Sequence, residues 1–295
     1  LRKGHSMAAR CLRLCLAILL PLLCAPAATA DEVYRIGAED DWYPFTALRE
    51  GKVQGMSADL VRAAFAASNT RVELVPYPYS RCMELTRTGH LAACFNTSPD
   101  ADIASEFRLP QEPLFSDDIL LWARHDNAQP VTDLQQLAGR KVAVTIGYEY
   151  GTAFDSLTDV ARVEVRRDLN GFRMLAHQRV AYTAAYRGIA AALFAEYPEL
   201  AGQFVPVATL HRPQLFVSFS RYHPQAELLL SRFDSGMRAL HRDGRYQQII
   251  ERWHLPDATP SGDASTLRPI LTTTRAQRPW PCLLYTSDAA DERSS

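Results

Sequence analysis

Three groups of polar and aromatic side chains have the types and positions expected of a small-molecule site. The first lies in the loop Glu39–Phe45, which follows a β-prone run and contains Asp41, Trp42 and Tyr43. Aromatic rings beside a proline in a polar loop can pack against the flat or apolar face of a ligand, although they could instead cover the core, above all Phe45. Because ligands of open α/β sheets bind at the carboxyl ends of strands, we predict that this loop forms one wall of a site.

The second group follows the next two predicted strands. Arg81 lies at a strand-to-helix junction and could hold a ligand carboxylate in a bidentate pair; a surface salt bridge is the alternative. Asn96, Thr97 and Ser98 follow the apolar run Leu91–Phe95, and short polar side chains there suit hydrogen bonds to a ligand. Ordinary turn chemistry ahead of a proline is the alternative explanation.

The third group lies in the second half of the chain. The buried-strand pattern Lys141–Ile146 leads into a glycine-bounded turn that contains Tyr148, Glu149 and Tyr150. Glu149 precedes a predicted helix and could hold a cationic ligand group. Tyr186 follows a weaker strand and could face the same site, with core packing as the alternative.

Strand and helix patterns alternate along the chain, which predicts an α/β fold whose sheets are mostly parallel and flanked by helices. We expect two lobes. The chain leaves the first lobe, builds a second one, and returns to the first through the strand Leu215–Ser220. Residues 31–124 and 215–258 are predicted to form lobe one and residues 125–214 lobe two. The two crossovers would form a hinge that closes around a ligand.

The first lobe resembles a known family. The features that carry the resemblance are an aromatic loop, a glycine-bounded hairpin and the start of a helix: Tyr43-Pro44-Phe45, Gly51 to Gly55, and Asp59-Leu60. They are similar to those of the periplasmic solute-binding proteins of ABC importers, family 3, the branch of the polar amino-acid binders. The resemblance runs to about Leu255. It implies a type 2 periplasmic binding fold that captures a small polar solute between two lobes, without cofactor or metal, and a monomer that delivers the solute to an importer permease in the inner membrane.

Two positions depart from the pattern of the family. Amino-acid binders place an arginine after a turn that corresponds to Ser98-Pro99-Asp100, whereas this chain has Ala101. They also keep an aspartate where this chain has Tyr186. Both charged anchors of an α-amino acid are therefore missing, which argues against an ordinary α-amino acid as the ligand.

Composition and the ends of the chain suggest an exported protein. The formal net charge of −1 gives no electrostatic case for binding nucleic acid or an anionic membrane. From Met7, a basic stretch, the apolar run Leu14–Leu23 and the sequence Ala28-Thr29-Ala30 predict a signal peptide that is cleaved after Ala30, and hence a periplasmic protein. Residues 259–295 lose all periodicity, and we expect a disordered or artefactual tail.

Cys82 and Cys94 are the two cysteines between the predicted signal peptide and this tail. In an oxidising compartment such a pair is a disulfide candidate, with two buried free thiols as the alternative. No histidine or acid lies at ligand spacing beside them, so we do not expect a metal site.

Two other classes of function remain open. No common hydrolase, metalloprotease or nucleotide-binding motif is found in the sequence, yet a few relatives of this family have become dehydratases that act on cyclic substrates. Related domains also serve as ligand sensors in membrane signalling proteins. We expect a binding protein and keep both alternatives.

Overall fold

The computed structural model describes residues 32–253, and these residues form two compact units. Unit 1 combines residues up to Ser116 with a segment that starts at Gln214, and unit 2 lies between them, from Asp117 to Pro213. The chain therefore leaves unit 1 once and returns once. The predicted signal peptide with its cleavage after Ala30, and the predicted tail 259–295, lie outside the described residues.

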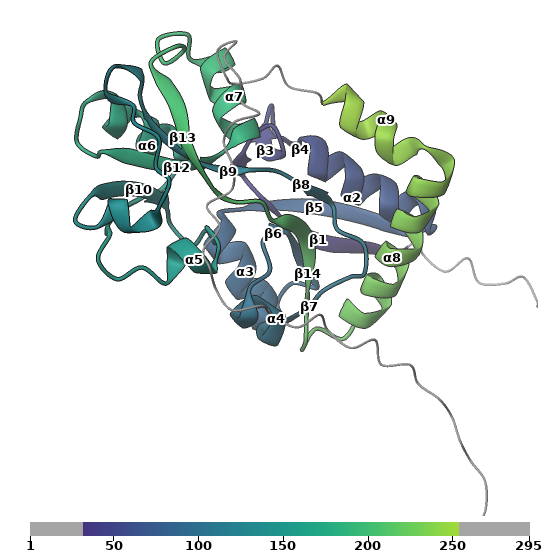
Figure 1. The fold of residues 1–295 in the computed structure, drawn as a ribbon. Coiled ribbons are helices and arrows are strands. Elements are labelled where there is room, and N and C mark those ends of the chain that lie inside the picture. The colour runs from purple at the N-terminus through teal and green to yellow at the C-terminus, as the bar shows by residue number, and fades with distance from the viewer. Residues whose placement is uncertain (1–31, 254–295) are drawn as a thin grey trace, which may run out of the picture. The chain divides into compact units, whose positions relative to one another are not determined.

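Unit 1 contains the parallel strands β1 and β5, a small hairpin sheet, and an antiparallel sheet around β14 (Figure 1). Its strands are β1 (Val33–Glu39), β2 (Asp41–Trp42), β3 (Thr46–Arg49), β4 (Lys52–Gln54), β5 (Arg71–Tyr77), β6 (Ala93–Thr97), β7 (Phe107–Arg108), β8 (Phe115–Ser116) and β14 (Gln214–Ser220). Its helices are α2 (Met56–Ala67), α3 (Tyr79–Arg87), α4 (Ala101–Glu106), α8 (Ala226–Asp243) and α9 (Arg245–Arg252).

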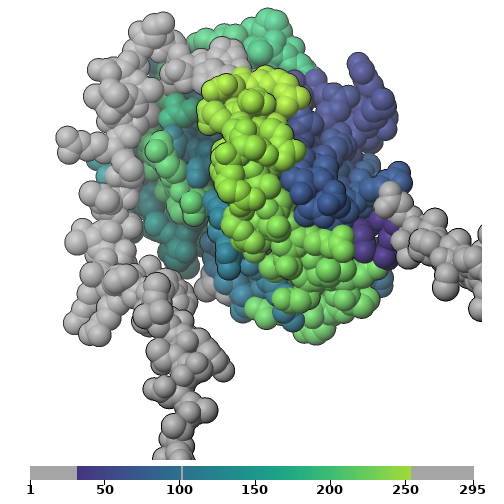
Figure 2. Space-filling model, turned by 90° about the vertical axis from the view of Figure 1, so that its right-hand side faces the viewer, coloured from purple at the N-terminus to yellow at the C-terminus, as the bar shows by residue number. Residues whose placement is uncertain are grey.

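Helices α2 and α8 pack closely because their facing positions are apolar or small. Phe65 of α2 meets Phe233 of α8, with ring centroids 5.7 Å apart. Gly236 permits the approach: a Cβ atom there would lie 1.8 Å from the carbonyl oxygen of Ala64. Figure 2 shows α8 and α9, in green and yellow, along one side of this unit.

Unit 2 is built on one five-stranded sheet of order β11-β10-β12-β9-β13. Its strands are β9 (Ile119–Arg124), β10 (Lys141–Thr145), β11 (Ala161–Val165), β12 (Tyr182–Tyr186) and β13 (Phe204–His211). Its helices are α5 (Thr152–Asp155), α6 (Asp168–Ala176), α7 (Arg187–Glu196) and the short 3-10 turns η2 (His125–Asn127) and η3 (Leu134–Leu137). Its core is aromatic: Phe172 packs against Trp122 and Phe204, with ring centroids 5.8 and 5.3 Å away.

The α/β class is as predicted, but the sheets are more mixed than expected. Strands β10, β11 and β12 are parallel, whereas β9 runs antiparallel to both of its neighbours, and β14 is antiparallel to β6. The first crossover also differs from the expected boundary after residue 124. It falls after Ser116, because β9 pairs with β12 and β13 and so belongs to unit 2.

Among residues 32–253, no helix has the length and apolar character needed to cross a membrane.

Candidate functional site

In unit 1, parallel pairing brings two of the predicted loops to one sheet edge. Glu39 at the end of β1 is opposite Tyr77 at the end of β5, and the Asp40 amide donates to the Tyr77 carbonyl at 3.0 Å. The loop with Asp41 and the junction with Arg81 therefore start from neighbouring strand ends. Asp41 and Arg81 are both exposed there.

Trp42 differs from its neighbours, because its ring belongs to the core of unit 1. The side chain is 2% exposed, and its ring centroid lies 4.8 Å from that of Phe45 and 6.4 Å from that of Phe115. This packing favours the core alternative for Trp42. Tyr43 is half-buried between the Arg49 guanidinium, 3.7 Å from the ring centroid, and the indole of Trp253.

Arg81 lies in the first turn of α3 with its side chain in solvent. No carboxylate of the described residues forms an ion pair with it. By contrast, Arg87 at the other end of the same helix is held by Glu84 through several hydrogen bonds. Arg81 is therefore the guanidinium of α3 that remains available for an anionic group.

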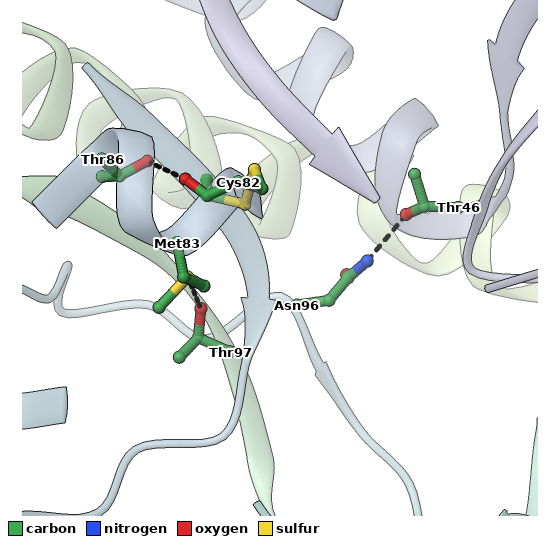
Figure 3. The surroundings of a disulfide bond; sticks show 7 residues. Thr46, Cys82, Met83, Thr86, Asn96 and Thr97 are labelled. Atoms are coloured by element: carbon green, nitrogen blue, oxygen red, sulfur yellow. Dashed lines mark hydrogen bonds between the residues drawn. A yellow bond between two sulfur atoms is a disulfide. The ribbon is translucent and has the colours of Figure 1, made fainter. Parts of the chain in front are cut away.

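A chain of neutral hydrogen bonds fixes the end of β6. The Asn96 amide donates to Thr46 Oγ1 at 2.7 Å (Figure 3). The two hydroxyls of Thr46 and Ser57 are also 2.7 Å apart. The Ser57 hydroxyl donates a hydrogen bond to the Phe45 carbonyl at 2.8 Å. Because a hydroxyl has only one proton to donate, Thr46 is the donor in its hydrogen bond with Ser57. Ser57 thus lies inside α2 and serves this network, although its position before an apolar stripe is typical of an N-cap.

Asn96 keeps one unused acceptor in this network. Its side chain is 5% exposed, its backbone is left-handed at φ 75°, and its Oδ1 has no hydrogen-bond partner among the described residues. A buried acceptor without a partner costs free energy, so a donor from outside would be favoured there. Thr97 is fully buried and its hydroxyl contacts the Met83 sulfur, while Ser98 is 3% exposed.

The predicted disulfide is confirmed and lies directly behind this edge. Cys82 of α3 and Cys94 of β6 are bonded, with Cα atoms 6.0 Å apart (Figure 3). The bridge ties the helix that carries Arg81 to the strand that carries Asn96. In the part of the chain that the structure describes, no cluster of three or more histidine, cysteine or acidic side chains could hold a metal.

In unit 2, the glycine-bounded turn after β10 is braced from within. The Thr145 amide donates to the Tyr150 hydroxyl at 2.6 Å, and the Thr145 hydroxyl donates to Asp168 at 3.1 Å. Burial, together with the charge of Asp168, raises the pKa of Tyr150, which is 2% exposed and stays neutral. Tyr150 therefore supports the turn, while Tyr148 and Glu149 are half-buried on it.

Tyr186, the last residue of β12, is 4% exposed, which favours core packing for its ring. The next residue, Arg187, points to a group of charges that sequence reasoning missed. Arg187 donates to Asp118 Oδ2 at 2.8 Å. Arg212 donates to both oxygens of the same carboxylate, from Nη2 to Oδ2 at 2.9 Å and from Nε to Oδ1. Asp117 accepts from the Gly188 amide at 2.9 Å.

Burial has opposite outcomes for the two aspartates. It raises the pKa of Asp117 to about 6, despite the backbone amides that donate to its carboxylate. Burial alone would also raise the pKa of Asp118, but the hydrogen bonds from Arg212 and Arg187 outweigh it and hold that pKa below its ordinary value. The sequence offers one indication of this charged group. Asp117 and Asp118 precede the buried strand β9, and an arginine follows each of the strands β12 and β13.

The family model of the bacterial extracellular solute-binding proteins, family 3, matches residues 34–256. An amino-acid ABC transporter-binding protein of Vibrio harveyi, PatH, is 25% identical over 131 residues, which are 44% of this chain and 52% of that protein. The chain thus matches about half the length of this curated relative.

Two solved structures share the fold at low identity. One is a histidine kinase sensor domain with similarity to periplasmic binding proteins: TM-score 0.67, 23% identity, 77% of this chain and 98% of that one. The other is the ancestral amino-acid-binding protein AncCDT-1, a precursor of cyclohexadienyl dehydratase: TM-score 0.63, 19% identity, 75% of this chain and 94% of that one.

Proposed function

Because the chain belongs to the bacterial extracellular solute-binding proteins, family 3, we propose that it captures a small polar solute outside the cytoplasm for an ABC importer. The observation that carries this proposal is the family match over residues 34–256, on a fold that brings two predicted loops of unit 1 to one sheet edge. The relationship to a protein named as an amino-acid ABC transporter-binding protein supports the importer as the partner.

Each unit, taken by itself, supplies candidates for contact with a solute. In unit 1 these are the exposed Asp41 and Arg81 and the half-buried Tyr43. Asn96 is buried, but we include it because its Oδ1 has no hydrogen-bond partner among residues 32–253. In unit 2 they are Tyr148 and Glu149. Trp42, Thr97, Ser98, Tyr150 and Tyr186 are buried, so we assign them to the support of these groups rather than to first contact.

The chemistry of these candidates suggests the kind of solute. Arg81 offers a guanidinium for an anionic group, Asn96 an acceptor for a donor, and Tyr43 an aromatic face. By the resemblance to the family, Ala101 and Tyr186 stand where amino-acid binders have their charged anchors. We therefore propose a polar solute that carries an acid and a hydrogen-bond donor but is not an ordinary α-amino acid.

A thermal-shift screen of the chain from Asp31 against amino acids, amines, organic acids and cyclohexadienyl acids tests the proposal. A solute at about 100 times its dissociation constant adds about 2.7 kcal/mol to stability, which is readily measured. The solute should be recovered unaltered from the protein. A compound that is consumed would contradict a pure binding role and put the enzyme alternative in first place.

Arg81→Gln should weaken binding of the solute found in the screen by about tenfold, since a charge-assisted pair is lost. Arg87→Gln on the same helix is the matched control and should leave the affinity unchanged, because Glu84 occupies that guanidinium. Equal affinities of both variants would exclude the placement at Arg81.

We further propose that the protein is a periplasmic monomer that meets an inner-membrane permease. Light scattering with and without solute should give the mass of one chain in both states. The N-terminal sequence of the exported protein should begin at Asp31.

A further inference from the structure

Unit 2 contains a cavity of about 750 Å³ at the edge of its sheet opposite the turn with Tyr148 and Glu149. It is lined by the end of β9, the start of β10 and the segment between α6 and β12. Strand registers explain the location: β10 and β12 both begin at this edge, and the antiparallel β9 ends there. The turn with Tyr148 and Glu149 follows the other end of β10, so the cavity is not part of the site described above.

The charge of the cavity is strongly one-sided. Four basic residues line it, Arg124, Arg140, Lys141 and Arg179, against one acid, Asp126. The acid is already used, because Asp126 accepts two hydrogen bonds from Arg124. The other three basic side chains are exposed and have no carboxylate within ion-pair distance among residues 32–253. Three positive charges therefore meet around one cavity of a chain whose net charge is −1.

The backbone holds these basic residues in place. The Arg140 carbonyl accepts from the Ala161 amide at 3.0 Å, and the Lys141 carbonyl accepts from the Ala181 amide at 2.9 Å. The Arg179 amide donates to the Met174 carbonyl at 2.9 Å. A ligand that binds here would have to order side chains but not loops, which lowers the cost of binding.

A second cavity shows that this imbalance is not a general property of the surface. The cavity of unit 1 between the hairpin and β5 has a similar volume, about 780 Å³. Its lining pairs two basic residues, Lys52 and Arg62, with two acids, Asp59 and Glu73. It carries no net charge, and Arg62 lies 3.8 Å from Asp59.

We propose that the basic cavity of unit 2 is a second ligand site, which binds a small organic or inorganic polyanion with at least two carboxylate or phosphate groups. Guanidinium groups bind both kinds of oxyanion in bidentate pairs. The volume lies within the range of pockets that hold small molecules, and it leaves room for an anion larger than a single phosphate. Because the side chains are exposed, the affinity is modest and falls as salt is added.

Isothermal titration of the whole exported chain with citrate and with pyrophosphate at low salt tests this site and distinguishes carboxylates from phosphates. At least one of them should bind with one site per chain, and acetate should bind far more weakly. The double variant Arg140→Gln/Arg179→Gln should lose at least about tenfold in affinity, a change of about 1.4 kcal/mol. Arg35→Gln, an exposed arginine on unit 1, is the control and should bind as the wild type does.

Equal binding of the probes to the double variant and the wild type would overturn the proposal, as would the absence of any heat with either probe. Both variants should retain the unfolding midpoint of the wild type, since the substituted side chains are exposed. The solute identified by the thermal-shift screen should bind the double variant with unchanged affinity. The outcome for this cavity is therefore independent of the proposed solute site.

Discussion

The strand ends that carry the candidate residues are stabilised by different forces in the two units. In unit 1, Trp42 packs among Phe45 and Phe115, neutral hydrogen bonds connect Asn96 to α2, and a disulfide lies behind them. In unit 2, hydrogen bonds of Thr145 to Tyr150 and Asp168 brace the turn with Tyr148 and Glu149. At the same sheet edge, two arginines share the carboxylate of Asp118. Neutral and apolar contacts are insensitive to pH and salt, whereas ion pairs respond to both. The two units therefore support their candidate residues with contacts that differ in their response to pH and salt.

The largest expected loss of stability comes from removing the buried indole of Trp42 in unit 1. Trp42→Ala should lower the free energy of unfolding of this unit by about 3–5 kcal/mol, because a buried ring is removed and a cavity is left. Urea unfolding, followed by hydrogen exchange of peptides from each unit, measures the loss and locates it.

Leu48→Ala is the control for Trp42→Ala, because Leu48 is 46% exposed and its truncation should change stability by less than about 0.5 kcal/mol. A loss for Trp42→Ala as small as that of the control would show that the ring is not part of the core.

The disulfide should have the next largest effect, and only on unit 1. Replacing Cys82 and Cys94 by serine opens a loop with a sequence separation of 12, which should cost about 3 kcal/mol on the chain-entropy estimate. Reduction of the wild type should have a similar effect, and the serine variant should not respond to reductant. Hydrogen exchange of unit 2 peptides should stay unchanged, since no cysteine lies between Asp117 and Pro213. Equal loss of protection in both units would contradict the comparison.

The positions in the chain of the loops that carry the candidate residues were predictable, because the strand and helix patterns on either side of each loop are local features of the sequence. The α/β class followed from such patterns. The disulfide was predicted from two cysteines in a chain expected to be exported, and the family from a resemblance of the aromatic loop, the hairpin and the helix start. Long-range partners could not be predicted in the same way. Trp42 is covered by Phe115, which is distant in the sequence, and Asp118 is paired with an arginine 94 residues further along the chain. The roles of the candidate residues toward a solute remain predictions.

The stability of unit 2 should depend on pH through Asp117. The pKa of Asp117 is about 6, above its ordinary value of 3.8, so the folded chain binds a proton that the unfolded chain has released between these pH values. Its contribution to stability is therefore present at low pH and is lost as pH rises through 6. The stability of the wild type relative to Asp117→Asn should fall by about 2 kcal/mol between pH 4.5 and 7.

Comparison with the variant cancels the other titrating groups, including Asp118, whose lowered pKa acts in the opposite direction. Ser57→Ala removes a neutral hydrogen bond at the edge of unit 1, so its stability difference from the wild type should not vary with pH. A difference between the wild type and Asp117→Asn that does not vary with pH would show that Asp117 titrates normally.

The smallest effect should distinguish the two arginines that share Asp118. Arg212→Gln should cost less than about 1 kcal/mol, because its side chain is 72% exposed and water screens the pair. Arg187→Gln should cost more, since this side chain is 23% exposed and Asp118 only 6%, so its loss leaves a buried carboxylate with weaker compensation. Urea unfolding at low and high salt measures both. Added salt should reduce the cost of Arg212→Gln more than that of Arg187→Gln, because screening acts mainly on exposed charges. The reverse order would mean that the exposed arginine alone stabilises Asp118.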